Sequence, residues 1–158
     1  MSVLNSENTI DRIIGFWQTE DLLRAYRFDV DKIFRKQFAE DGRNEEAKAF
    51  LIELKSSMEK QDVVEHGHTH HSMELIEEKE NKHGELLELD LEYANHFEKI
   101  KNPIKAYNQQ QPTPMSAVAV LFELLYAYYL KRIAGDELNE TVATMAESAG
   151  FCLNKLYG

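Results

Sequence analysis

Residues 115–134, MSAVAVLFELLYAYYLKRIA, decide the fold class, because apolar side chains occupy nearly every side of the helix that they would form. Such a helix needs neighbours all around it, so we expect this segment to be the central, apolar helix of the protein, ended by Gly135. The segment contains Glu123 and is too short to span a bilayer. It therefore predicts a buried core helix.

The same helical spacing of apolar residues continues on both sides of this segment, and no run alternates as a strand would. We therefore expect an all-α fold, a single domain over residues 1–158 built as a bundle of about six helices. Asn8, Asp29 and Asn44 are suited to cap the first three helices, and Gly84 is a candidate kink in the fourth. The expected helices cover residues 8–28, 29–42, 44–58, 72–100, 115–134 and 139–156.

A segment rich in proline and glutamine, 102–114, separates the fourth expected helix from the fifth. It contains all three prolines of the chain and the run Gln109, Gln110 and Gln111, a composition typical of turns and linkers. We therefore expect a connecting segment here, and with it the main break in the chain.

The charge of the chain argues against several classes of partner. Its 158 residues include 18 Lys and Arg against 28 Asp and Glu, a formal net charge of -10. Such a surface repels phosphate, so we expect no binding to nucleic acid or to anionic membranes. The N-terminus has no basic start and no apolar run typical of a signal peptide, so we expect a cytoplasmic protein. The single cysteine, Cys152, follows the apolar spacing of the last helix and is expected to be a buried, unreactive thiol.

Several charged residues lie where a helical core should be apolar. At about 100° per residue, Glu20, Asp21 and Arg24 project from the same side as Trp17. Glu20 precedes Arg24 by four residues, the favourable order for an ion pair, and buried ions need such partners. We weigh a structural network, which is the commoner outcome, against a polar pocket between helices. The candidate pocket residues are Trp17, Glu20, Asp21, Arg24, His68, His83, Glu123 and Tyr126.

Four histidines form a second cluster between the third and fourth expected helices. In an extended segment His66, His68 and His70 would point the same way, and with His71 they are candidate ligands for zinc, nickel or copper. The spacing resembles that of metallo-β-lactamase-like hydrolases, but the acidic residue before the last histidine and the β-rich sequence are missing. Neighbouring loop histidines are more often solvated, so we assign no metal and no other cofactor.

An enzyme is the least favoured class. The acidic stretch 74–90 invites comparison with all-α nucleotide pyrophosphohydrolases, which hold magnesium with paired acids. Asn81 stands where the third glutamate of their motif belongs, so a solvated helix face is the simpler interpretation. No nucleophile with a nearby base, glycine-rich phosphate loop or zinc-protease motif is present in the sequence.

Four motifs together resemble an uncharacterised bacterial family of mostly helical proteins, classed as a domain of unknown function. They are WQTEDLLRA at 17–25, which is the strongest, the pair Gly67 and His68, His83 with Leu86 and Leu87, and FELLY at 122–126 followed by Leu130 and Arg132. The resemblance covers nearly the whole chain. It implies that the misplaced charges matter more than His66, His70 and His71, and it implies no activity, substrate or cofactor.

We expect a non-catalytic helical module that acts through a protein partner or through self-association. Exposed aromatic residues such as Phe16, Tyr107, Tyr128 and Tyr129 are the candidate contact surface. The alternative is a bundle that binds a small molecule or a metal, through the polar pocket or through the cluster from His66 to His71.

Overall fold

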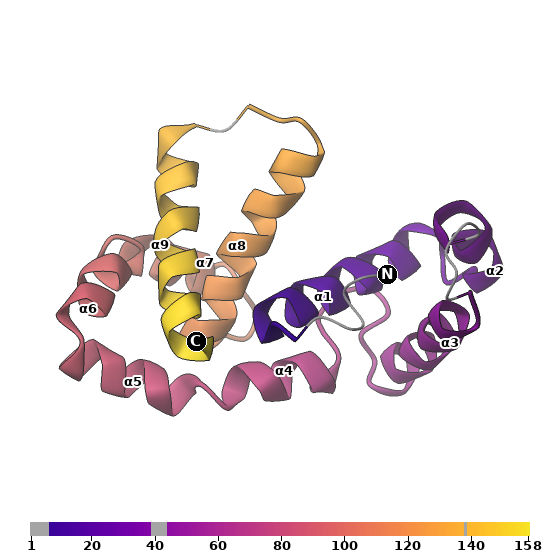
Figure 1. The fold of residues 1–158 in the computed structure, drawn as a ribbon, viewed down its shortest axis with the longest axis horizontal. Coiled ribbons are helices and arrows are strands. Elements are labelled where there is room, and N and C mark those ends of the chain that lie inside the picture. Colours follow the sequence, from indigo (N-terminus) through magenta and orange to yellow (C-terminus); the bar gives the residue numbers. More distant parts are fainter. Residues whose placement is uncertain (1–6, 39–43, 138) are drawn as a thin grey trace. The chain divides into compact units, whose positions relative to one another are not determined.

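The fold is all-α, as the spacing of apolar residues predicts. The computed structural model describes residues 7–38, 44–137 and 139–158, and these residues form helices, turns and irregular connections but no strand (Figure 1). The chain forms two compact units, which we call the N-terminal unit (Met1–Glu74) and the C-terminal unit (Leu75–Gly158). The division falls inside helix α4 (His70–Glu77).

The N-terminal unit begins with a long helix that ends at a tight corner. Its elements are α1 (Thr9–Ala25), α2 (Val30–Ile33), the π-helical turn Phe34–Phe38 that continues α2, α3 (Asn44–Lys60) and the first turns of α4. The expected caps are confirmed at two positions, because the Asn8 and Asp29 side chains accept hydrogen bonds from the first N–H groups of α1 and α2. The expected helix end at Gly42 and the side chains of Phe38 and Asn44 lie outside what the structure describes.

The corner between α1 and α2 closes the core of this unit. Arg27 and Phe28 adopt positive φ angles of 52° and 63°, and the Phe28 N–H group donates to the Leu23 carbonyl over 2.7 Å. This reversal lets α2 and α3 pack against α1. The core combines apolar residues from all three helices, namely Leu23, Ile33, Ala47, Leu51, Leu54 and Met58.

The prediction of a single helix over residues 72–100, most of which belong to the C-terminal unit, is wrong. The chain forms three helices there, α4, α5 (Glu80–Leu89) and α6 (Leu91–Glu98). The break between α5 and α6 occurs at Asp90, whose extended backbone ends α5 and whose side chain accepts from the Tyr93 N–H group to cap α6. Gly84, the expected kink, lies inside α5. The capping carboxylate of Asp90 therefore sets the corner, which the sequence predicts at Gly84.

The proline and glutamine segment is also more ordered than its composition predicts. Helix α7 (Lys101–Gln109) occupies most of it, and only residues 110–116 are irregular. Pro103 fits because it lies in the first turn of α7, where a backbone N–H group has no partner inside the helix. The Asn108 side chain then closes the irregular stretch through two hydrogen bonds with the backbone of Met115. The two compact units adjoin in sequence at Glu74 and Leu75, outside this segment.

The last two helices, α8 (Ala117–Ile133) and α9 (Glu140–Tyr157), pack against each other as a hairpin. In Figure 1 the loop of this hairpin lies away from α5 and α6. The expected central helix is confirmed for the first half of α8, where residues 118–122 are all buried. Its last residues, 129–133, are exposed, so the expectation of neighbours all around α8 is wrong there. Within the described residues, no helix combines the length and the apolar character needed to cross a membrane.

Two glycines of this unit allow a matched test of the backbone. Gly135 ends α8 at a φ of +73°, whereas Gly84 lies in the middle of α5, and a Cβ at either position would meet no atom within 4 Å. Gly135→Ala should therefore lower the free energy of unfolding by about 1 kcal/mol through backbone strain. Gly84→Ala should raise it by about 0.5–1 kcal/mol, because alanine favours the helix. Urea unfolding followed by circular dichroism measures both, and two shifts of the same sign would contradict this assignment of the helix ends.

Candidate functional site

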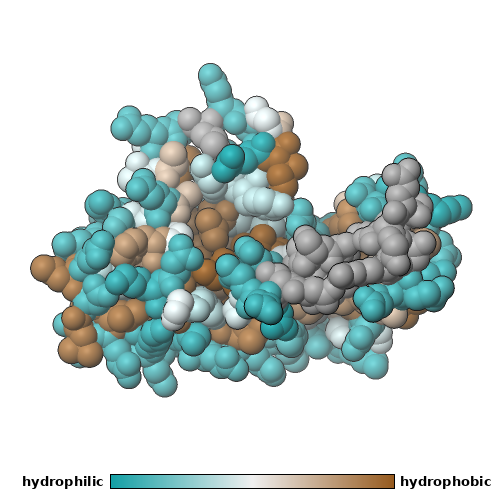
Figure 2. All heavy atoms as spheres, in the orientation of Figure 1, coloured by the Kyte–Doolittle hydropathy of each residue, from teal (hydrophilic) through white to brown (hydrophobic). Residues whose placement is uncertain are grey.

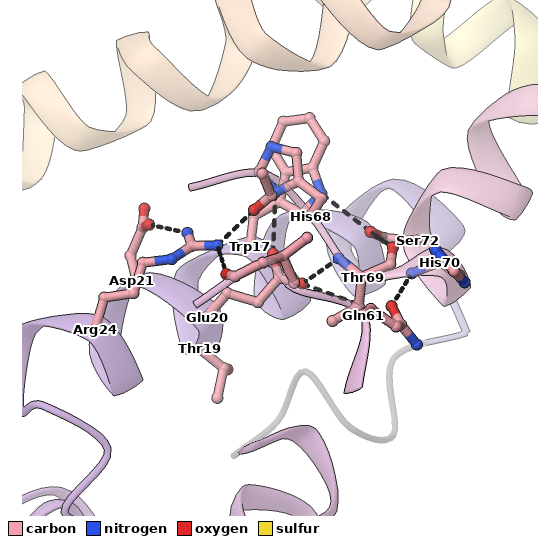
Figure 3. A network of polar contacts seen from close by, with 12 residues as sticks. Trp17, Thr19, Glu20, Asp21, Arg24, Gln61, His68, Thr69, His70 and Ser72 are labelled. Atoms are coloured by element: carbon pink, nitrogen blue, oxygen red, sulfur yellow. Dashed lines mark hydrogen bonds and ion pairs between the residues drawn. The ribbon is translucent and has the colours of Figure 1, made fainter. Parts of the chain in front are cut away.

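The central residue of the candidate site is Glu20, a fully buried glutamate on α1. Its carboxylate accepts hydrogen bonds from the Thr69 N–H group at 3.0 Å and from the Thr69 hydroxyl at 2.9 Å. The Nδ1 atom of His68 lies 2.9 Å from its other oxygen (Figure 3). Burial of a carboxylate costs several kcal/mol unless partners compensate it. These three contacts therefore make the buried position of Glu20, and with it the position of α1, energetically possible.

An aromatic pair covers the carboxylate. The ring of His68 stacks on the ring of Trp17 with centroids 3.8 Å apart and an angle of 6° between the planes. The Trp17 Nε1–H group donates to the Ser72 hydroxyl at 3.2 Å, and that hydroxyl donates to the Thr69 carbonyl. Figure 3 shows both rings lying over one another above the loop that precedes α4. The stacking fixes the imidazole in the plane from which it reaches Glu20.

Arg24, one turn further along α1, holds the earlier part of the same loop. Its guanidinium donates to the carbonyls of Val63, Val64 and Gly67 and pairs with Asp21 at 3.0 Å. A planar group with five N–H donors suits several carbonyls at once. Gly67 adopts a φ of +91°, and this favours glycine at the point where its carbonyl turns towards Arg24. We call the set Trp17, Glu20, Arg24, His68 and Thr69 the Glu20 latch.

The Glu20 latch differs from the arrangement that the sequence predicts. Glu20 and Arg24 do turn inward, but they do not pair with each other, because each is occupied by partners from the segment 63–69. No buried side-chain nitrogen or oxygen among the described residues lacks a hydrogen-bond partner. A ligand at this position would have to displace an existing contact, which favours the structural interpretation of the network.

Sequence analysis missed Thr69, Ser72 and the three backbone carbonyls that bind Arg24. Carbonyls belong to every residue, so the sequence carries no signal for those of Val63 and Val64. Gly67 is indicated only by the family resemblance, whereas His68 is also a candidate in the pocket and in the histidine cluster. The hydroxyl of Thr69 looks like any other loop hydroxyl until the fold brings it to Glu20.

The remaining pocket candidates, His83, Glu123 and Tyr126, belong to the C-terminal unit. His83 is buried, its Nδ1 atom lies 2.6 Å from the Tyr93 hydroxyl, and its ring packs against Phe97. Burial lowers the pKa of His83 below 6.5 and raises the pKa of Tyr93. Glu123 is half-buried and Tyr126 is buried, both on α8. The grouping of all eight residues in one pocket stays a prediction.

The histidine segment does not adopt the expected extended arrangement. His68 belongs to the Glu20 latch, whereas His70 and His71 lie in the first turn of α4 and His66 is exposed in a bend. The ring of His71 lies against Phe16 at 4.9 Å. Among the described residues, no three His, Cys, Asp or Glu side chains are grouped so that they could hold a metal ion. The extended segment in which His66, His68 and His70 would point the same way is not formed, because His66 lies in a bend and His70 begins α4.

A separate surface lies on the C-terminal half of α8. Phe122, Tyr126, Tyr129 and Ile133 share one side of the helix at about 100° per residue, with Leu130 at the edge. Their exposed fractions rise along the helix, from 0% for Phe122 and 6% for Tyr126 to 39% for Tyr129 and 60% for Ile133. We call these five residues the α8 stripe. Figure 2 shows hydrophobic side chains exposed at this end of α8, next to the hairpin loop.

The aromatic residues expected to form a contact surface are less exposed than predicted. Tyr129 is exposed, but Phe16, Tyr107 and Tyr128 are half-buried. Phe16 packs against Phe50 with centroids 5.4 Å apart and lies in the other unit. The expectation of one exposed aromatic patch is therefore confirmed for Tyr129 alone.

Comparison with known families supports the resemblance to a family of unknown function. The model of a family described as a domain of unknown function, DUF4924, matches residues 2–157. The chain belongs to this family. The DUF4924 match covers both units and includes the whole Glu20 latch and the α8 stripe. No curated protein and no solved structure is similar enough to the chain to match it.

The Glu20 latch predicts a large stability effect from a small change. Glu20→Gln keeps the shape of the side chain but turns an amide nitrogen towards groups that are themselves donors. The free energy of unfolding should fall by about 1–3 kcal/mol, the cost of leaving buried donors without acceptors. Trp17 is the single tryptophan, so its fluorescence during urea unfolding reports on the N-terminal unit. Glu59→Gln, an exposed change on α3, is the control and should shift the value by less than about 0.5 kcal/mol.

His83 predicts a pH dependence of stability. Its pKa in the folded state is lowered from 6.5 by burial, so the unfolded chain binds a proton that the folded chain does not. Its contribution is complete above pH 6.5 and falls as the pH drops from 6.5 towards the lowered pKa. Urea unfolding between about pH 7 and about pH 5 should show this loss, and His83→Gln should flatten it. The exposed His66→Gln is the matched control, and an unchanged slope in His83→Gln would contradict the assignment.

Proposed function

We propose that this DUF4924 member is a non-catalytic helical module that self-associates through the exposed end of the α8 stripe. The observation that supports the proposal is the rise in exposure along one continuous apolar side of α8. The first part of the stripe is covered and the last part, with the same residue chemistry, is not. Burial of a leucine or isoleucine side chain contributes about 1.5–3 kcal/mol, so this end gains from a partner that covers it.

A second copy of the chain suits this surface better than an unrelated partner. Arg132 lies near the exposed end of the stripe, and Asp136 and Glu137 follow the helix after Ala134 and Gly135. A twofold axis that crosses the helix near Ile133 would bring the basic group of each copy towards the acidic pair of the other. Twofold dimers are the commonest soluble assemblies, and they require a self-complementary surface of this kind. With a net charge of -10 on each copy, local charge pairing also reduces the repulsion between copies.

The chemistry of the described residues supports a non-catalytic role. The Glu20 latch is closed by its own hydrogen bonds. Burial raises the pKa of the Cys152 thiol to about 11, so it stays protonated at neutral pH and is a poor nucleophile. The Glu20 latch and Cys152 therefore support a structural role. The exposed end of the α8 stripe, by contrast, is apolar.

Self-association can be measured by sedimentation velocity over a concentration series. The unmodified chain should sediment as a dimer whose fraction grows with concentration, and Leu130→Gln combined with Ile133→Gln should give a monomer, because two exposed apolar side chains leave the contact. Leu89→Gln, at a residue that is 83% exposed outside the stripe, is the matched control and should leave the dimer intact. A monomer at every concentration, or a dimer lost in the control alone, would refute the proposal.

A charge swap tests the twofold arrangement in the same experiment. Arg132→Glu should weaken the dimer, because it places like charges together across the axis. Arg132→Glu combined with Asp136→Lys and Glu137→Lys should restore it, since the basic group and both acidic groups are then reversed in each copy. Weakening without rescue would exclude the proposed pairing across the axis.

A further inference from the structure

A pocket of about 370 Å³ lies in the N-terminal unit, between α1, α3 and the start of α4. This volume falls within the range of pockets that bind small molecules, about 300–1,000 Å³. Its walls include Arg12 and Phe16 of α1, Phe50 and Ser57 of α3, and Gln61 and His71 beyond α3. None of these residues belongs to the Glu20 latch, and the pocket is distinct from the polar site that the sequence predicts.

The Glu20 latch nevertheless builds one wall of the pocket. Thr69 lines the pocket, and its N–H group and hydroxyl both donate to Glu20. The next residue, His70, donates its backbone N–H group to the Gln61 side-chain oxygen at 2.7 Å. The carbonyl end of the Gln61 amide is therefore occupied, and among the described residues no acceptor is recorded for its two N–H donors, which could serve a ligand. The wall is held in place before any ligand arrives.

Arg12 gives the pocket a positively charged group that forms no ion pair with a described residue. Its side chain is half-buried, and it makes no ion pair or side-chain hydrogen bond with any other residue that the structure describes. By contrast, Arg24 on the same helix is occupied by Asp21 and three carbonyls. A guanidinium in this state favours an anion that can accept two parallel hydrogen bonds.

Aromatic and aliphatic side chains form another part of the pocket lining. Phe16 and Phe50 meet edge to face, with ring centroids 5.4 Å apart and an angle of 74° between the planes. The His71 ring lies against Phe16, and Leu54 adds a buried aliphatic surface. Aromatic walls of this kind bind planar rings by stacking and edge contacts. The pocket therefore combines one cationic group with an aromatic wall.

We propose that this pocket binds a small aromatic monocarboxylate, with the carboxylate on Arg12 and the ring against Phe16 and Phe50. A single negative charge is favoured over a phosphate, because Arg12 is the one Lys or Arg among the described lining residues and the carboxylate of Glu53 stands in the same lining. A dianion would be repelled by Glu53 and by the net charge of -10. The Ser57 hydroxyl and the Gln61 amide supply further donors for the carboxylate oxygens.

Phenylpropionate is a suitable probe, because it carries one carboxylate and one ring. Titration into the full chain with ¹⁵N amide detection should shift resonances of α1, α3 and residues 69–71, with a dissociation constant in the range of about 10 μM to 1 mM. Phenylpropionamide removes the charge and propionate removes the ring, and each should bind at least about tenfold more weakly. Equal binding of the amide, or no shift with phenylpropionate at about 5 mM, would overturn the proposal.

Variants of the chain locate the site. Arg12→Gln should weaken phenylpropionate binding by about tenfold or more, because a charged pair is replaced by a neutral contact. Arg35→Gln, at an exposed arginine of the same unit, is the matched control and should leave the affinity unchanged. Circular dichroism and Trp17 fluorescence confirm that each variant is folded. Because Arg12 is not part of the core, a folded Arg12→Gln variant that still binds with full affinity would refute the assignment.

Discussion

The burial of the Glu20 carboxylate is the constraint on which the N-terminal unit depends. A charge taken out of water needs several hydrogen bonds, and α1 cannot supply them to its own side chain. The donors come instead from His68 and Thr69, nearly fifty residues later in the chain. The position of α1 and the path of the loop before α4 are thus fixed together, and His71 and Thr69 come to line a pocket as a consequence.

The two units of the chain use their unusual side chains in opposite ways. In the N-terminal unit the misplaced residues are polar, and they are satisfied inside the unit by backbone and side-chain partners. In the C-terminal unit the residues in an unusual environment are the apolar side chains at the end of α8, which face solvent. A satisfied interior stabilises one arrangement, whereas an exposed apolar side gains energy only from an outside partner. This contrast is the reason why we propose that recognition by another macromolecule uses the C-terminal unit.

Periodicity predicts this fold well wherever a helix buries one continuous side. It located α1, α3, α8 and α9 within a few residues, because each keeps its apolar spacing for about five turns. It failed where local chemistry decides. Asp90 ends a helix by capping the next one, and Pro103 is tolerated because it falls in a first turn. The same holds for the candidate site. The spacing of residues predicts that Glu20 and Arg24 turn inward, but it does not predict their partners in the segment 63–69.

The contrast between Arg12 and Arg24 shows why the partners escape prediction. The two residues lie about 120° apart around the same helix, so they face different neighbours. Arg24 is satisfied by carbonyls of 63, 64 and 67, which any sequence would offer. What selects those carbonyls is the loop path, and the loop path depends on the contacts of Glu20. In sequence the two arginines are alike, and only the fold makes one a structural residue and leaves the charge of the other open in a pocket.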